Sequence, residues 1–311
     1  MRTISRPSSV HSLSICCSKA PEENVMGSYY CLMAGAPDIT LDTKQGFTVL
    51  EFKEQLEDII SESDQKLLYY FYLHYDCRNL VKLLKNPESE IDPRGNLSLD
   101  QLNDLITHAR ELNFNVHRYP DFMSIFAREF NYNKDKAGWF AEDVMELEYY
   151  TYAQTVKNKM MRQWYSMNLN LGNILTALIA KKYGWNVGDY IMGDNEVNEM
   201  IRTNRTTDFG LGSELDYMPQ LMRIVSTQDP VEKEREIDAF KWAWLDDATF
   251  FDPFTIEAVF AYLIKLDMLE RWAILDVEEG KKTFRSLIEN LRKSAQVPEE
   301  FQHKDLFKRK T

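Results

Sequence analysis

The sequence predicts an all-α protein. After Phe47, apolar residues recur three and four positions apart through most of the chain, which is the spacing of one face of a helix. Residues that start or stop helices separate these stretches. Alternation of apolar and polar residues, the pattern of a strand, never extends beyond a few positions. With 44% hydrophobic and 13% aromatic residues among 311, the chain has enough apolar material for a packed core.

Helices in the first part of the chain are delimited by local signals. The Asn86-Pro87 pair stops a helix whose cap is expected at Ser63 or Asp64. Ser98-Leu99-Asp100-Gln101 has the spacing of a capping box and starts the next helix. The helices expected here cover residues 49–60, 64–85, 98–113 and 120–130.

The second part of the chain opens with a helical tract over residues 136–182. Helices much longer than about 25 residues are unusual in compact domains, so we expect a break or bend near Asn168–Gly172. Shorter helices are then expected over residues 195–204, 214–226 and 230–247. Asp252-Pro253 is a start signal for a last long helix over residues 254–293.

Charge and hydropathy exclude two kinds of direct partner. The net charge is -12 and the pI is near 5.0, so a surface that binds nucleic acid through phosphate neutralisation is not expected. The longest uncharged run, residues 163–180, contains a serine and three asparagines and is too polar to cross a bilayer. Any membrane association is therefore expected to go through another protein.

Motifs that would carry chemistry are missing from the sequence. The four cysteines form no CxxC pair, the five histidines lack ligand spacing, and no GxxxxGK[ST] sequence occurs. We therefore predict no catalytic residue, no metal ligand and no cofactor.

The main alternative to a protein without catalytic residues is a helical metal-carboxylate hydrolase. Its site would be the acidic group around Glu142 and Glu146. These two residues lie four apart on one helix face, but the Glu-x-x-His element of dinuclear sites occurs only once, at Glu300–His303. A solvated acidic helix face explains the pattern better. A general helical scaffold protein is a third hypothesis.

Two segments of the chain are similar to each other. Residues 75–85 and 168–181 both contain asparagine followed by aliphatic residues at helical spacing and a basic residue near the end. From the pattern alone, chance similarity between two amphipathic helices remains the simpler explanation.

The same segments resemble a family of stalk subunits of V/A-type rotary ATPases, called C in archaeal and bacterial complexes and d in eukaryotic ones. That family carries repeated Asp-x-x-Asn-aliphatic segments, and Asp76–Leu80 fits the pattern. Asn170–Ile174 resembles it with Asn in place of Asp, and Leu147–Tyr150 is similar to the family's Leu-Asp-x-Tyr-Tyr element. Residues 253–265 resemble its last long helix, after which this chain has Asp267, Glu270, Arg271 and Ile274 where the family has a glutamate and an Arg-aliphatic pair.

The resemblance implies a funnel of three similar helical domains with pseudo-threefold symmetry, over residues 26–115, 116–210 and 211–311. Residues 1–25 are serine-rich and aperiodic, so we expect an extension there and interpret Met26 as the natural start. A non-catalytic subunit of this kind would join the central stalk to the proteolipid ring, in the cytoplasm and at the inner face of the plasma membrane through the complex. The segments around Asn79, Asn173 and Glu257 are the expected contacts.

Overall fold

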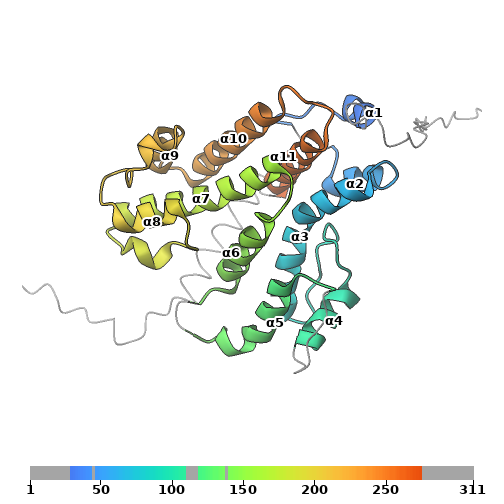
Figure 1. Ribbon diagram of the computed structural model, residues 1–311, viewed down its shortest axis with the longest axis horizontal. Coiled ribbons are helices and arrows are strands. Elements are labelled where there is room, and N and C mark those ends of the chain that lie inside the picture. Colours follow the sequence, from blue (N-terminus) through green and yellow to red (C-terminus); the bar gives the residue numbers. More distant parts are fainter. Residues whose placement is uncertain (1–28, 44–45, 110–117, 137–138, 275–311) are drawn as a thin grey trace, which may run out of the picture.

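The computed structural model describes residues 29–43, 46–109, 118–136 and 139–274, and all regular structure in these ranges is helical (Figure 1). This confirms the all-α prediction. The α-helices are α1 (Tyr30–Gly35), α2 (Val49–Glu57), α3 (Glu62–Lys85), α4 (Leu99–Ala109), α5 (Asp121–Asn133), α6 (Ala141–Ala153), α7 (Lys159–Lys182), α8 (Glu196–Thr203), α9 (Met218–Ser226), α10 (Pro230–Thr249) and α11 (Ile256–Ile274). Two short 3₁₀ helices, η1 (Val187–Tyr190) and η2 (Leu211–Ser213), lie in the loops beside α8.

Most helix ends follow the expected signals. The cap of α3 is Ser61, two residues before the first expected cap, Ser63, and its hydroxyl accepts the backbone N–H of Asp64 at 3.1 Å. It ends at Lys85, before the Asn86-Pro87 stop. The last expected helix is seen as α11, and its continuation beyond residue 274 lies outside the described residues, as do residues 1–25 and Glu300–His303.

The expected break near Asn168–Gly172 is wrong, since α7 runs through this region without interruption. The chain breaks earlier, between α6 and α7, where the Asn158 side chain accepts the N–H of Met161 at 3.1 Å and caps α7. Gly172 costs helix stability relative to alanine, but its neighbours Leu171 and Ile174 are buried and hold the helix in place.

Three helices form the centre of the molecule: α3, α7 and α11. They meet at Phe260 of α11, whose ring centroid lies 6.4 Å from that of Phe71 on α3 and 5.9 Å from that of Tyr165 on α7. Phe260 is fully buried, and burial of a phenylalanine side chain contributes about 2 to 3 kcal/mol. The buried apolar residues of the other helices continue this core into one cluster.

The remaining helices cover the central three. Helix α3 packs against α4, α5 and α6, helix α7 against α6, α8 and α9, and helix α11 against α10 and α2 (Figure 1). Helix α2, from the N-terminal part of the chain, therefore lies on the last described helix.

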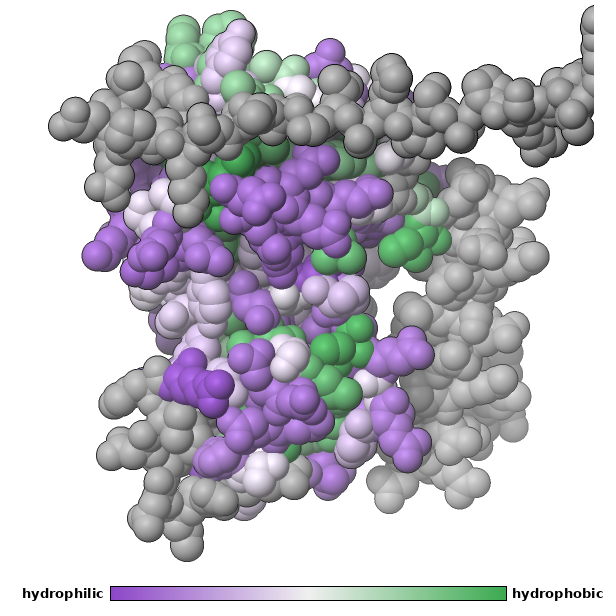
Figure 2. Space-filling view, turned by 90° about the vertical axis from the view of Figure 1, so that its right-hand side faces the viewer, coloured by the Kyte–Doolittle hydropathy of each residue, from purple (hydrophilic) through white to green (hydrophobic). Residues whose placement is uncertain are grey.

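One face of the molecule is mainly polar (Figure 2). Figure 2 shows a face on which hydrophilic residues predominate and hydrophobic residues form smaller patches. In the described part of the chain, no helix combines the length and the apolar character needed to span a bilayer.

Candidate functional site

A buried polar pair lies on α3 three residues apart, formed by Asp76 and Asn79, and both side chains are fully buried. The Asn79 amide donates to the carbonyl of Asp92 at 2.9 Å, and its oxygen accepts the Asp92 N–H at 2.7 Å. Both backbone groups of Asp92 are thereby paired with one side chain. Asn79 thus fixes the loop that follows α3.

The Asp76 carboxylate binds the same loop a few residues further on. It accepts the backbone N–H groups of Asn96 at 3.0 Å and of Leu97 at 2.9 Å, and also the Asn96 amide at 2.9 Å. Burial raises the pKa of Asp76, although these donors and the nearby Lys53 ammonium oppose the rise. A Cβ on Gly95 would lie 2.3 Å from an Asp76 carboxylate oxygen, so only glycine fits there without displacement.

A second polar pair lies on α7, formed by Asn170 and Asn173. The Asn173 amide donates to the carbonyl of Met192 at 2.8 Å, and its oxygen accepts the Met192 N–H at 2.9 Å. Asn170 accepts the side-chain amide of Asn195, the residue that caps α8, at 2.9 Å. This pair therefore holds the segment that leads from α7 into α8, as the first pair holds the segment that leads into α4.

A third pair, Asp267 and Glu270, lies on α11 with the same spacing. Glu270 accepts the N–H of Val49, the first residue of α2, at 2.7 Å, and the guanidinium of Arg94 at 2.5 Å. Asp267 accepts the Tyr75 hydroxyl at 2.7 Å and the Arg94 guanidinium at 3.2 Å. Burial raises the pKa of Glu270, while the Val49 N–H and Arg94 oppose the rise.

The three helices that carry the polar pairs begin at equal intervals along the chain, at residues 62, 159 and 256. Each pair binds a segment that enters a shorter helix, which is α4, α8 or α2. The first two segments follow their central helix directly in the sequence. The third comes from the N-terminal part of the chain, because α2 precedes α11 by about two hundred residues.

The expected contact residues have different positions. Asn79 and Asn173 are buried and belong to polar pairs, so a partner that binds these segments would touch their exposed neighbours instead. Glu257 is half-buried in the first turn of α11 and accepts the side-chain amide of Asn158 at 2.6 Å, which joins the starts of α7 and α11. Partner contact by these segments stays a prediction.

Cations of neighbouring helices lie near two members of the acidic group on α6. Glu142 forms an ion pair with Lys85 of α3. Burial raises the pKa of Glu146, while Arg78 and Lys241 oppose the rise. Among the residues that the structure describes, no three His, Cys, Asp or Glu side chains gather in a way that would hold a metal ion.

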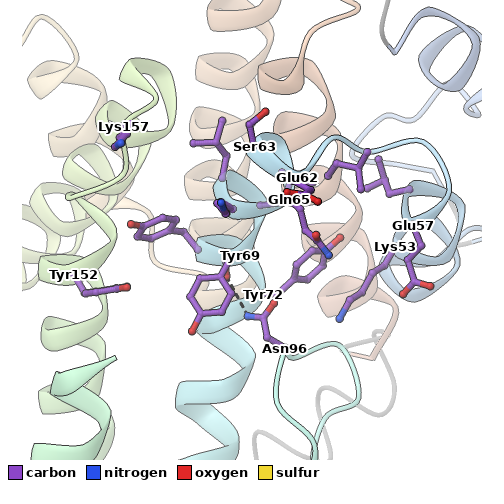
Figure 3. Close-up of a pocket in the computed structure, with 16 residues that line it drawn as sticks. Lys53, Glu57, Glu62, Ser63, Gln65, Tyr69, Tyr72, Asn96, Tyr152 and Lys157 are labelled. Atoms are coloured by element: carbon purple, nitrogen blue, oxygen red, sulfur yellow. Dashed lines mark hydrogen bonds between the residues drawn. The ribbon is translucent and has the colours of Figure 1, made fainter. Parts of the chain in front are cut away.

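A groove of about 960 Å³ crosses the first half of α3. Figure 3 shows Lys53 of α2 on one side, Tyr152 of α6 on the other, and Tyr69 and Tyr72 of α3 between them. The Lys53 ammonium donates to the carbonyls of Arg94 and Gly95, at 3.1 and 2.7 Å, and lies 4.5 Å from the Tyr72 ring centroid. The best-defined polar contacts of the groove therefore fasten the loop after α3 to α2.

The fold and the three polar pairs define an all-helical protein whose buried polar groups fix its loops. A family model described as "Protein of unknown function (DUF2764)" matches residues 26–295, so the chain belongs to this family. No curated protein and no solved structure matches the chain.

Proposed function

We propose that this protein is a non-catalytic connector subunit of a V/A-type rotary ATPase, which couples the central rotor shaft to the proteolipid ring in the membrane. One observation carries the proposal: a polar pair with the same spacing, in which the second residue is buried, recurs on three long, equally spaced helices. The resemblance to the stalk subunits rests on two of these pairs, Asp76/Asn79 and Asn170/Asn173. The pair on α11 extends the repeat to a third helix.

The proposed arrangement is a funnel of three similar units around a pseudo-threefold axis. Helix α2 contributes to the third unit through its contact with α11, so the units do not follow the chain strictly in sequence. The protein is proposed to lie on the cytoplasmic side of the membrane and to reach it only through its partner subunits.

Stiffness is the physical property that such a connector needs. Loops are usually the least stable parts of a helical protein. Here the loops after α3 and α7 are each bound by buried side chains of the preceding helix. Hydrogen bonds of this kind contribute about 1 kcal/mol each, and a buried group left without a partner costs about 1 to 3 kcal/mol. Such loops resist deformation under load, which supports a mechanical role.

The first experiment identifies the partners. The tagged protein is expressed at native level in its source organism, extracted from membranes with mild detergent, and recovered for mass spectrometry. We expect central-stalk and proteolipid subunits of a V/A-type ATPase at near-equal amounts. Recovery without any ATPase subunit, or turnover of a small molecule by the purified protein alone, would overturn the proposal.

A charge reversal tests the contact segment around Asn79. Lys82 is exposed on the same helix three residues further on, and Lys134, exposed after α5, is the matched control. We expect Lys82→Glu to reduce recovery of the partner subunits at least fivefold and Lys134→Glu to change it less than twofold, with equal melting temperatures. Equal recovery in both variants would remove this segment from the contact.

A second experiment tests coupling. Membrane vesicles depleted of the protein are expected to hydrolyse ATP but to lose ATP-driven ion transport, and added protein is expected to restore transport. Transport that is unchanged by depletion would contradict a role between the shaft and the ring.

A further inference from the structure

Three exposed aromatic side chains lie in a row where α7 ends. Tyr183, Trp185 and Tyr190 are 62%, 52% and 48% exposed. The ring centroids of Tyr183 and Trp185 are 5.4 Å apart, and those of Trp185 and Tyr190 are 5.6 Å apart. We call these three residues the aromatic ladder.

The backbone holds the aromatic ladder in place. Gly184 has φ of +71°, the left-handed conformation that glycine adopts readily at the end of a helix. The next residue, Trp185, donates its N–H to the carbonyl of Ala180 at 2.8 Å. The Asn186 amide donates to the Asp189 carboxylate at 2.8 Å, which closes the turn before Tyr190. The rings are therefore preorganised for contact, which lowers the entropic cost of binding.

Core packing does not explain the size of these side chains. Within the described part of the chain, no ring of the aromatic ladder belongs to the hydrophobic core. The apolar residues of the segment that carries the aromatic ladder that do pack against the core are Val187 and Ile191. Large exposed apolar groups on an otherwise polar surface are typical of interaction sites.

The surroundings of the aromatic ladder are acidic. Residues 181–202 contain four exposed carboxylates and two exposed cationic side chains, Lys182 and Arg202, and Arg202 pairs with Asp194 at 2.7 Å. Three of the four carboxylates line a shallow hollow of about 500 Å³ at the start of α8. Tyrosine and tryptophan faces attract guanidinium and ammonium groups, and carboxylates pair with the same groups. The carboxylates are Asp189, Asp194, Glu196 and Glu199.

We propose that the aromatic ladder and its neighbouring carboxylates bind an arginine- or lysine-bearing segment of another protein. The cationic side chains stack on the exposed rings and form ion pairs with the carboxylates. The surface is a poor match for nucleic acid or anionic lipid, because both would meet the four carboxylates. This inference goes beyond the proposed connector function and does not depend on it.

The test measures binding of a labelled peptide by fluorescence anisotropy. The probe is a twelve-residue peptide of alternating arginine and alanine, and the neutral control peptide has citrulline in place of arginine. We expect saturable binding of the arginine peptide and at least tenfold weaker binding of the citrulline peptide. Two variants of the full chain, Trp185→Ala/Tyr190→Ala and Glu196→Gln/Glu199→Gln, are each expected to weaken binding about tenfold.

Matched variants elsewhere on the surface separate a specific site from general attraction to an acidic protein. Tyr132→Ala removes a ring that is 78% exposed, and Glu88→Gln/Glu90→Gln removes two exposed charges from the loop after α3. Both are expected to change the affinity less than twofold. Equal losses in these controls, or no loss in Trp185→Ala/Tyr190→Ala, would overturn the proposal. So would binding to phosphatidylglycerol vesicles that requires Trp185, because the surface would then serve a membrane.

Discussion

Arg94 connects the loop after α3 to the last described helix, and its replacement by methionine is the most direct test of the third polar pair. Its guanidinium binds Glu270 at 2.5 Å and Asp267 at 3.2 Å, and it also pairs with Asp92. The side chains of Arg94 and Glu270 are only 19% and 10% exposed. Arg94→Met keeps the apolar stem but leaves the carboxylates without this cation.

The structure sets the expected size of the effect. Loss of one partner from a buried ion pair costs about 3 to 5 kcal/mol. Glu270 retains the hydrogen bond from the Val49 N–H at 2.7 Å, so we expect the lower end, about 3 kcal/mol. Glu270→Gln removes the buried charge and keeps an oxygen that accepts this N–H. The loss of stability in the double variant Arg94→Met/Glu270→Gln is therefore expected to be about 1 to 2 kcal/mol smaller than the sum of the two single losses.

Urea denaturation followed by far-ultraviolet circular dichroism measures these free energies. Arg235→Met is the control, because Arg235 is 61% exposed and lies 3.6 Å from Asp42, an ion pair worth less than about 0.5 kcal/mol. If Arg94→Met is no more damaging than the control, or if the two single effects simply add, the buried ion pair does not hold α11 as described.

Two further predictions concern a half-buried histidine and a pair of glycines. Burial lowers the pKa of His74 from 6.5 to about 3. Between these two pH values the unfolded chain binds more protons than the folded chain. The free energy of unfolding therefore falls as the pH falls through this window, by about 1.4 kcal/mol per pH unit. His74→Phe is expected to flatten this part of the stability profile, measured as urea midpoints from pH 7 to pH 4, and an unchanged slope would contradict the assignment. Gly95→Ala is expected to lower stability by about 2 kcal/mol, because the added Cβ would lie 2.3 Å from Asp76. Gly172→Ala is expected to raise stability by about 0.5 to 1 kcal/mol, because no atom lies within 4 Å of the added Cβ. Thermal unfolding of both glycine variants checks this pair, and a shift of the same sign in both would refute the packing argument.

The helical fold could be predicted because its signals are local. Apolar spacing and stop residues placed the ends of α3, α8 and α10 within about two residues, a normal uncertainty for helix ends. The length of the tract over residues 136–182 correctly indicated a break, but the break lies between α6 and α7 and not near Gly172. The Asn158 cap was a local signal for the true break.

The polar pairs could be predicted only in part. Asn79 and Asn173 stood out through the similarity of their segments, yet the sequence did not show that they are buried. Asp267 and Glu270 have the same spacing, but their partners Val49 and Arg94 are more than 170 residues away in the chain. A pairing over that distance leaves no periodic signal in a single sequence, so only the folded structure reveals it.

The attachment of α2 to α11 has a consequence for synthesis. The Val49 N–H and the Glu270 carboxylate are 221 positions apart, so at about 5 to 20 residues per second the ribosome makes the acceptor roughly ten to forty seconds after the donor. During this interval the apolar face of α2, with Val49, Phe52 and Leu56, has no α11 to cover it. Nascent chains of this protein therefore expose the apolar face of α2 to other contacts until α11 has been made.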